Sequence, residues 1–219
     1  MKRKIAFLHA SPAAIAPLMQ YYGASAPEFE ITNLLDDGIL RLFAAGDFAA
    51  VETRLRDLLA VAQSAYGAEF ALVTCSAVPR DLMNRLCAET PVPVLKIDAP
   101  MAAKAVRTGG RIGVAVTFAP TLDPATRLLT EAAEEIGASV ELISRVMPEA
   151  YQALLGGNLE RHDELLLAGI DQLAGQGVDA IVLAQVSMAR ILEKAEARVP
   201  MPVFSSLQTS LAAIRDRLA

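Results

Sequence analysis

Several residue types are scarce in this chain, and each shortage removes a class of protein from consideration. The 219 residues include only two cysteines and no tryptophan, so a disulfide framework cannot hold the fold together. Basic residues number 20 against 25 acidic ones, and the resulting negative charge argues against nucleic acid as a partner. No apolar run approaches the roughly 18 residues of a membrane-spanning helix. These absences predict a cytoplasmic protein with no membrane partner.

Familiar motifs for cofactors, nucleotides and metals are also missing. The sequence has no Gly-x-Gly-x-x-Gly, no phosphate-binding Gly-x-x-x-x-Gly-Lys-Ser/Thr run, no serine-hydrolase elbow and no metal-ligand spacing. No alternative motif therefore competes for the function of this chain, and we expect no metal ion.

Apolar residues make up 53% of the chain and charged residues 21%, which is typical of a folded protein with a substantial core. Short apolar runs alternate with segments of helical periodicity. Strands are predicted at 5–9, 30–35, 71–75, 92–97, 111–117, 139–146, 180–186 and 202–205. Helices are predicted after Pro79 and at 11–21, 47–66, 98–110, 124–136, 159–173, 188–197 and 207–217.

The second half of the chain repeats the first in a degenerate form. The segment 67–75 aligns with 177–185, and beyond it Arg80 aligns with Arg190. Alternating strands and helices with short connections predict mainly parallel sheets. The expected fold is α/β, with two pseudo-symmetric three-layer α/β/α lobes, each built on a four-stranded sheet, and an active-site cleft between the lobes.

Cys75 lies at the carboxyl end of a predicted strand in the first lobe, which is expected to comprise 1–98 and 206–219. Gln185 takes the same place in the second lobe, 99–205. In an open α/β sheet, ligands bind at this edge because helix amino-termini converge there. A helix beginning just after Cys75 would lower the pKa of its thiol from about 8.5 and increase the thiolate fraction.

Five segments resemble the aspartate/glutamate/hydantoin racemase superfamily, and the resemblance covers essentially the whole chain. They are Leu8-His9-Ala10-Ser11-Pro12, Leu34-Leu35-Asp36-Asp37, Val73-Thr74-Cys75-Ser76-Ala77, Gly113-Val114-Ala115-Val116-Thr117 and Val182-Leu183-Ala184-Gln185-Val186-Ser187-Met188. The resemblance implies cofactor-independent chemistry, in which one cysteine removes a proton from the carbon next to a carboxylate and another protonates the opposite face. Cys75 matches the first position, whereas Gln185 stands where the second cysteine would be.

An amide neither gives up nor accepts a proton at accessible pH, so Gln185 leaves three hypotheses open. In a racemase or isomerase, which is the leading hypothesis, His9, Ser187 or a bound water would serve the second face. In a decarboxylase of a malonate-like acid, Cys75 alone would protonate the enediolate left by carbon dioxide. In a binding protein, the cleft would hold a small carboxylate without catalysis.

Hydroxyl and amide groups at strand ends are the expected ligands of the substrate carboxylate. Losing one donor to an enediolate costs roughly 3–4 kcal/mol of barrier. The predicted substrate-binding residues are Ser11, Ser76, Thr117, Gln185 and Ser187, with His9, Thr74 and Thr121 as auxiliary candidates. The expected partner is a small carboxylate-bearing substrate, and homologues of this architecture often form homodimers.

Several polar residues also have plain structural interpretations. Cys87, midway along a helix, is expected to be buried as a small apolar side chain, and His162 to lie on a solvated helix start. Asp36-Asp37 is interpreted as a polar turn. Ser11 would cap a helix, and His9 would be a hydrogen-bonded histidine at a strand end.

Overall fold

The structure is a computed structural model that describes residues 2–219, and it divides the chain into two compact units. The first unit runs to Ile97 and also contains Leu211–Ala219, and the second unit is Asp98–Ser210. The final helix, α10 (Ser206–Leu218), begins within the second unit and ends within the first. Among residues 2–219, no helix combines the length and apolar character needed to cross a bilayer.

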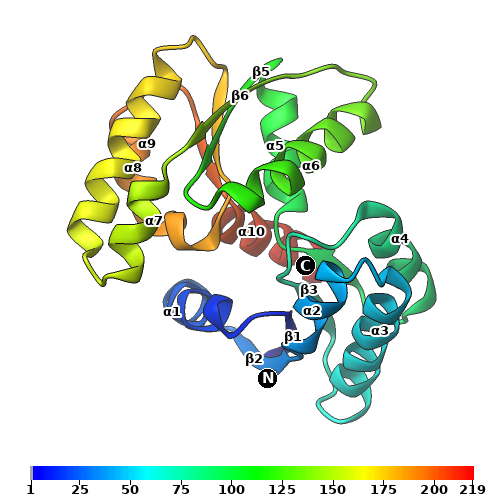
Figure 1. The fold of residues 1–219 in the computed structure, drawn as a ribbon. Coiled ribbons are helices and arrows are strands. Elements are labelled where there is room, and N and C mark those ends of the chain that lie inside the picture. The colour runs from blue at the N-terminus through cyan, green and yellow to red at the C-terminus, as the bar shows by residue number, and fades with distance from the viewer. Residues whose placement is uncertain (1) are drawn as a thin grey trace. The chain divides into compact units, whose positions relative to one another are not determined.

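The first unit is built on a parallel sheet with strand order β2-β1-β3-β4. Figure 1 labels β1, β2 and β3 of this sheet. Its strands are β1 (Arg3–His9), β2 (Phe29–Leu35), β3 (Phe70–Val73) and β4 (Val94–Lys96). Its helices are the 3-10 helix η1 (Pro12–Ala14), α1 (Ile15–Ser25), α2 (Gly38–Ala44), α3 (Phe48–Ser64) and α4 (Arg80–Glu89).

The second unit repeats this plan, with strand order β6-β5-β7-β8 and all pairs parallel. Its strands are β5 (Arg111–Val116), β6 (Glu141–Val146), β7 (Ala180–Leu183) and β8 (Val203–Ser205). Its helices, besides the start of α10, are α5 (Ala99–Thr108), η2 (Ala119–Thr121), α6 (Leu122–Glu135), α7 (Pro148–Leu155), α8 (Leu159–Ala174), η3 (Val186–Ile191) and α9 (Leu192–Glu196).

The long helices α3 and α8, which lead into the third strand of their units, start and pack in the same way. Asp47 caps α3 by accepting the Ala50 N–H at 3.0 Å, and Asn158 caps α8 by accepting the Arg161 N–H at 3.0 Å. Each helix buries a stripe of side chains at helical spacing. These stripes are Val51, Leu55, Leu59 and Ala62 in α3, and His162, Leu166, Ile170 and Leu173 in α8.

Helices cover both faces of each sheet, as the three-layer prediction requires. In the first unit, α3 and α4 pack with one face of β1 and β3, while on the other face the rings of Phe7 and Tyr22 meet edge to face at 4.9 Å. In the second unit, one apolar cluster joins α8 and η3 to the sheet, and another joins α5 and α6 to it. The predicted α/β fold with two four-stranded parallel sheets is confirmed.

The internal repeat extends to the turns that follow the third strand of each unit. Val78 donates its N–H to Cys75 O at 3.4 Å, and Met188 donates to Gln185 O at 3.0 Å. Each acceptor residue lies two positions beyond its strand, β3 or β7. Cys75 and Gln185 are therefore equivalent positions of the duplicated unit, as the sequence alignment of the two halves predicted.

The sequence did not predict two short helices, α2 and α7. Asp36 and Asp37, which the sequence predicts as a polar turn, lead directly into α2 at Gly38, where the Asp36 carboxylate accepts the Gly38 N–H at 3.0 Å. Helix α7 begins at Pro148, which fits the first turn because its nitrogen has no hydrogen to leave unbonded. Helices this short span too few residues for periodicity to reveal them.

Candidate active site

Cys75 lies just beyond the carboxyl end of β3, where its backbone carbonyl closes the turn described above. Its side chain is partly exposed and packs against the apolar cluster of the first unit. The neighbouring Ser76 is also partly exposed. Helix α4 begins at Arg80, as predicted, and the loop at 76–79 separates the thiol from the amino-terminus of this helix. The sulfur is thus placed at the edge of the sheet where α/β proteins bind ligands.

His9 ends β1, next to β3, and its imidazole is held on both sides. Asn33 Oδ1 lies 2.9 Å from Nε2, and because a carbonyl oxygen can only accept, Nε2 donates. Thr74 Oγ1 lies 2.9 Å from Nδ1 and 3.1 Å from Leu8 O, so this hydroxyl joins the imidazole to the strand. His9 is 1% exposed, and burial lowers its pKa below the usual 6.5. His9 is therefore the hydrogen-bonded histidine at a strand end that the sequence predicts, and Thr74 holds its ring in place.

Burial of His9 predicts a pH dependence of stability. Because its pKa is lowered in the folded state, the unfolded chain binds this proton first, and stability is lost as pH falls below about 6.5. The His9 contribution has a slope of at most about 1.4 kcal/mol per pH unit. The free energy of unfolding, measured with urea at several pH values from 5 to 8, should change less steeply with pH in His9→Gln than in the wild type. The same pH dependence of the unfolding free energy in both proteins would contradict the expectation.

Ser11 and Thr121 make short local hydrogen bonds near the ends of β1 and β5. Ser11 Oγ accepts the Ala13 N–H at 3.3 Å and caps η1, as the sequence predicted. Thr121 donates its hydroxyl to Phe118 O at 2.6 Å. Ser11 stays partly exposed, so its oxygen can still meet a ligand, whereas the Thr121 hydroxyl proton is already committed to the backbone.

In the second unit, Gln185 and Thr117 bind each other across the ends of β7 and β5. Gln185 Oε1 accepts the Thr117 N–H at 2.5 Å and the Thr117 hydroxyl at 2.9 Å. Thr117 is 1% exposed, so these donors have little access to water. The Gln185 amide oxygen is occupied, and the amide nitrogen is the part of the side chain that remains to donate to a ligand.

The prediction that His162 lies on a solvated helix start is wrong. Its side chain is 0% exposed, and its Nδ1 lies 3.2 Å from Asp163 Oδ1. The prediction rested on the charged residues around His162, which are typical of a solvated helix start. Asn158, however, sets the start of α8, and this places His162 on the buried stripe one turn before Leu166. The spacing of His162, Leu166 and Ile170 in the sequence is the signal that could have revealed it.

The prediction that Cys87 is buried is also wrong, because Cys87 is exposed. The buried stripe of α4 consists of Leu82, Met83 and Leu86, so Cys87 lies at the edge of that stripe. Its Sγ is 3.6 Å from Val94 O, and the part of the thiol that is covered raises its pKa. A raised pKa leaves less thiolate at neutral pH, which makes Cys87 a poor acid/base candidate.

Asp36 has structural partners that support its interpretation as a local polar element. Besides the bond to Gly38, its Oδ2 lies 3.4 Å from Arg54 NH1 of α3. Within residues 2–219, no group of three or more His, Cys, Asp and Glu side chains is arranged to hold a metal ion.

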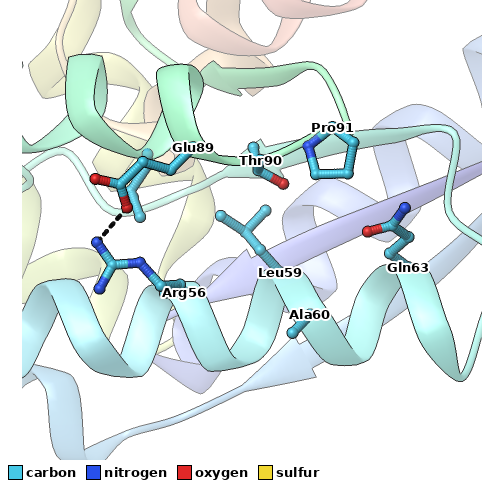
Figure 2. A pocket seen from close by; sticks show the side chains of 8 residues that line it. Arg56, Leu59, Ala60, Gln63, Glu89, Thr90 and Pro91 are labelled. Carbon is cyan, nitrogen blue, oxygen red and sulfur yellow. Dashed lines mark hydrogen bonds and ion pairs between the residues drawn. The ribbon is translucent and has the colours of Figure 1, made fainter.

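A small pocket of about 130 Å³ lies between α3 and the end of α4 (Figure 2). Arg56 and Glu89 form an ion pair of 2.5 Å at one end of it, and Gln63 and Pro91 lie at the other. Since Pro91 precedes β4, this pocket is near the amino ends of the strands, and Cys75 follows the carboxyl end of β3. It is not the candidate active site.

Two copies of a parallel α/β unit, with Cys75 and Gln185 following the carboxyl ends of equivalent strands, define the class to which this chain belongs, a duplicated parallel α/β protein. Residues 26–214 match the family model described as Asp/Glu/Hydantoin racemase. The chain therefore belongs to the Asp/Glu/hydantoin racemase family.

Solved structures of this family share the fold at low sequence identity. A putative Asp/Glu racemase from Yersinia pestis is 19% identical, with a TM-score of 0.69 and 98% of each chain covered. An aspartate racemase homologue from Pyrococcus horikoshii is 16% identical, with a TM-score of 0.72 and 99% of this chain and 98% of the other covered. Allantoin racemase from Klebsiella pneumoniae is 17% identical, with a TM-score of 0.71 and 99% and 88% covered. Comparison with curated protein sequences gives no match.

Proposed function

We propose that the chain is a cofactor-independent racemase or isomerase that acts at the carbon next to a carboxylate in a small amino-acid-like substrate. Membership of the family supports racemase chemistry in general. The single observation that carries the assignment is Cys75, a partly exposed thiol that follows the carboxyl end of β3. In this proposal Cys75 is the general acid/base that removes and returns the proton of the substrate carbon.

The carbon acid is weak, so donors must stabilise the enediolate that forms. Ser11 and Ser76 are the proposed donors of the first unit, because both remain partly exposed near the ends of β1 and β3. In the second unit, Gln185 and Ser187 are the proposed direct ligands of the substrate, and Thr117, which donates both its N–H and its hydroxyl to Gln185 Oε1, would take part by holding Gln185 in position. Of these, Gln185 would act through its amide nitrogen, since its oxygen already binds Thr117.

The state of Gln185 also favours a second candidate function, a decarboxylase that needs only one acid. A glutamine cannot exchange a proton. In a malonate-like substrate, the bond between the central carbon and one carboxylate breaks. Carbon dioxide leaves, and the electron pair of that bond stays with the rest of the substrate. The enediolate that remains takes the proton of the Cys75 thiol, and solvent reprotonates the thiolate. A protein that only binds a carboxylate is the non-catalytic outcome of the same test.

The two reactions are separated by incubating the protein in D₂O with aspartate, glutamate, hydantoins and substituted malonates. Racemisation should incorporate deuterium at the α-carbon and invert its configuration. Proton NMR measures the deuterium incorporation, and chiral chromatography measures the inversion. Release of carbon dioxide from a malonate would support the decarboxylase instead. Thermal stabilisation by a carboxylate without deuterium incorporation or carbon dioxide release would contradict both enzyme proposals.

A further inference from the structure

The segment that follows Gln185 is an unusual helix. η3 keeps 3-10 geometry over six residues, whereas 3-10 runs longer than three or four residues are uncommon because their hydrogen bonds are poorly aligned. In the first unit, the helix that follows the third strand, α4, is an α-helix of ten residues. η3 therefore depends more than α4 does on contacts with other elements to keep its shape.

The start of η3 is bound to the sheet edge and to the core of the second unit. Gln185, the residue before η3, accepts the N–H and the hydroxyl of Thr117 at the end of β5. Its backbone carbonyl accepts the Met188 N–H at 3.0 Å. The Met188 side chain is 0% exposed and joins the apolar cluster that contains the buried stripe of α8. These contacts fix Gln185 and the inner side of η3.

The far end of η3 is bound to α8 by the carboxylate of Asp163. This carboxylate lies 3.2 Å from Arg190 Nη1 of η3, from Lys194 Nζ of α9 and from His162 Nδ1 of its own helix. Because a carboxylate can only accept, all three groups donate to it. Asp163 is 6% exposed, and the low local dielectric makes these contacts stronger than ion pairs in water. Arg190 also donates to Leu159 O at 3.4 Å, so η3 is bound twice to the first turns of α8.

His162 contributes to this arrangement as a donor, and core packing does not explain it. It is 0% exposed, and its Nε2 has no hydrogen-bond partner among residues 2–219. A buried polar atom without a partner is destabilising, so an apolar side chain would pack better here. The first unit has one at the equivalent place, because Val51 follows the Asp47 cap of α3 as His162 follows the Asn158 cap of α8. Unlike valine, the histidine supplies an N–H to Asp163, a carboxylate that has little access to water.

The first unit has a related ion pair at the equivalent place. Glu52 stands in α3 where Asp163 stands in α8, five residues after the helix cap, and it pairs with Arg85 of α4 at 2.7 Å. Each unit thus binds its long helix to the helix that follows its third strand. Arg85 lies in the second turn of α4, beyond the loop that separates this helix from the thiol, whereas Arg190 shares the short helix η3 with Ser187. The ion pair of the second unit therefore bears directly on a proposed ligand of the substrate.

We propose that Asp163 is a positioning residue for the substrate-binding segment that begins at Gln185. By holding Arg190, Asp163 fixes the part of η3 that carries Ser187, while the bonds from Thr117 fix Gln185 at the other end. The inference rests on the proposed function, in which the Gln185 amide nitrogen and the Ser187 hydroxyl bind the substrate carboxylate. Asp163 does not touch the substrate and acts through Arg190. Because a substrate carboxylate is bound both before and during the reaction, loosening its ligands should affect KM more than kcat.

The test compares three variants of the full chain. Arg190→Gln removes the donor of η3, and because Arg190 is exposed its loss leaves the core intact. Asp163→Asn removes the same ion pair from the side of α8. Arg198→Gln is the matched control, since Arg198 pairs with Asp171 of α8 at 2.7 Å, about two turns further along that helix, and lies beyond α9. KM and kcat are measured with the substrate found in the panel above, and amide hydrogen exchange is followed by mass spectrometry.

The expected result is a local change at η3. Arg190→Gln and Asp163→Asn should raise KM about tenfold, while kcat stays within about threefold of the wild type. The Met188 N–H, which closes the first turn of η3, should exchange about tenfold faster or more. The amides of β5 and β7 should exchange as in the wild type. Arg198→Gln should keep KM within about twofold and leave the exchange of η3 unchanged.

Other outcomes would overturn the inference in distinguishable ways. If the Met188 N–H exchanges at the wild-type rate in Arg190→Gln and Asp163→Asn, Asp163 does not hold η3. If that exchange rises but KM does not, Asp163 supports the fold without positioning the ligands. If Arg198→Gln raises KM equally, or if β5 and β7 also exchange faster, the effect is a general loss of stability. If the wild type turns over no substrate of the panel, the proposed function fails and the claim about substrate binding with it, while the exchange of Met188 still shows whether Asp163 holds η3.

Discussion

Cys75→Ala should lower turnover by about 10²–10⁴-fold, the contribution typical of a positioned acid/base. The reason is that the thiol has no substitute at its end of β3. His9 is buried and bonded to Asn33 and Thr74, and its lowered pKa keeps it neutral near pH 7. The loss should appear in kcat, since alanine keeps the shape of the loop and leaves the hydroxyls of Ser11 and Ser76 to bind the carboxylate.

Cys87→Ala is the matched control for the loss of a thiol. Cys87 is exposed and its raised pKa disfavours the thiolate, so its removal should leave turnover within about twofold. Circular dichroism and thermal unfolding of both variants should match the wild type, because neither sulfur is sealed in the core. Retained turnover in Cys75→Ala, or equal losses in the two variants, would remove Cys75 from the mechanism.

The equivalence of Cys75 and Gln185 could be predicted from the sequence, because both residues follow buried parallel strands and such strands are easily found in a sequence. A strand that is covered on both faces is an uninterrupted apolar run, and the runs at β3 and β7 are followed by Cys75 and Gln185 at the same distance. Their alignment predicted the repeat, and strand order and turn bonds bear out the internal correspondence. The parallel arrangement followed from the alternation of strands with helices.

Side-chain partners could not be predicted in this way, because they depend on contacts between distant segments. The sequence shows Gln185 as a missing thiol, but its bond to Thr117 exists only once β5 and β7 pair. His162 was misjudged for a different reason. Its neighbours in the sequence are charged, and this local composition hid its helical spacing from Leu166 and Ile170, which places it on the buried stripe of α8.

The largest loss of stability is expected at a glycine that makes room for another side chain. Gly109, which follows α5, has extended backbone with φ −178°, so an alanine is not strained by its backbone angle. A Cβ there would lie 2.3 Å from Asp179 Cβ. Since that atom is fixed to the Asp179 backbone, rotation of the side chain cannot relieve the overlap, and one of the two chain segments must move.

The displaced aspartate anchors the first residue of β5. Asp179 Oδ2 accepts the Arg111 N–H at 2.8 Å, and the Asp179 N–H donates to Arg111 O at 2.7 Å. Overpacking costs about 1–3 kcal/mol, and a lost hydrogen bond adds about 0.5–1.5 kcal/mol. Gly109→Ala should therefore lower the free energy of unfolding by about 2–4 kcal/mol, measured by urea denaturation.

Gly110→Ala is the matched control in the same connection, because the atom nearest to its added Cβ is Ser139 O at 4.0 Å, an ordinary contact. Replacing a glycine where the space and the backbone allow it stabilises by about 0.4–1 kcal/mol, since the unfolded chain loses freedom. The two substitutions should therefore change the free energy of unfolding in opposite directions. Equal unfolding free energies for the two variants would mean that Asp179 does not pack against Gly109 as the structure has it, and that the start of β5 is held by other contacts.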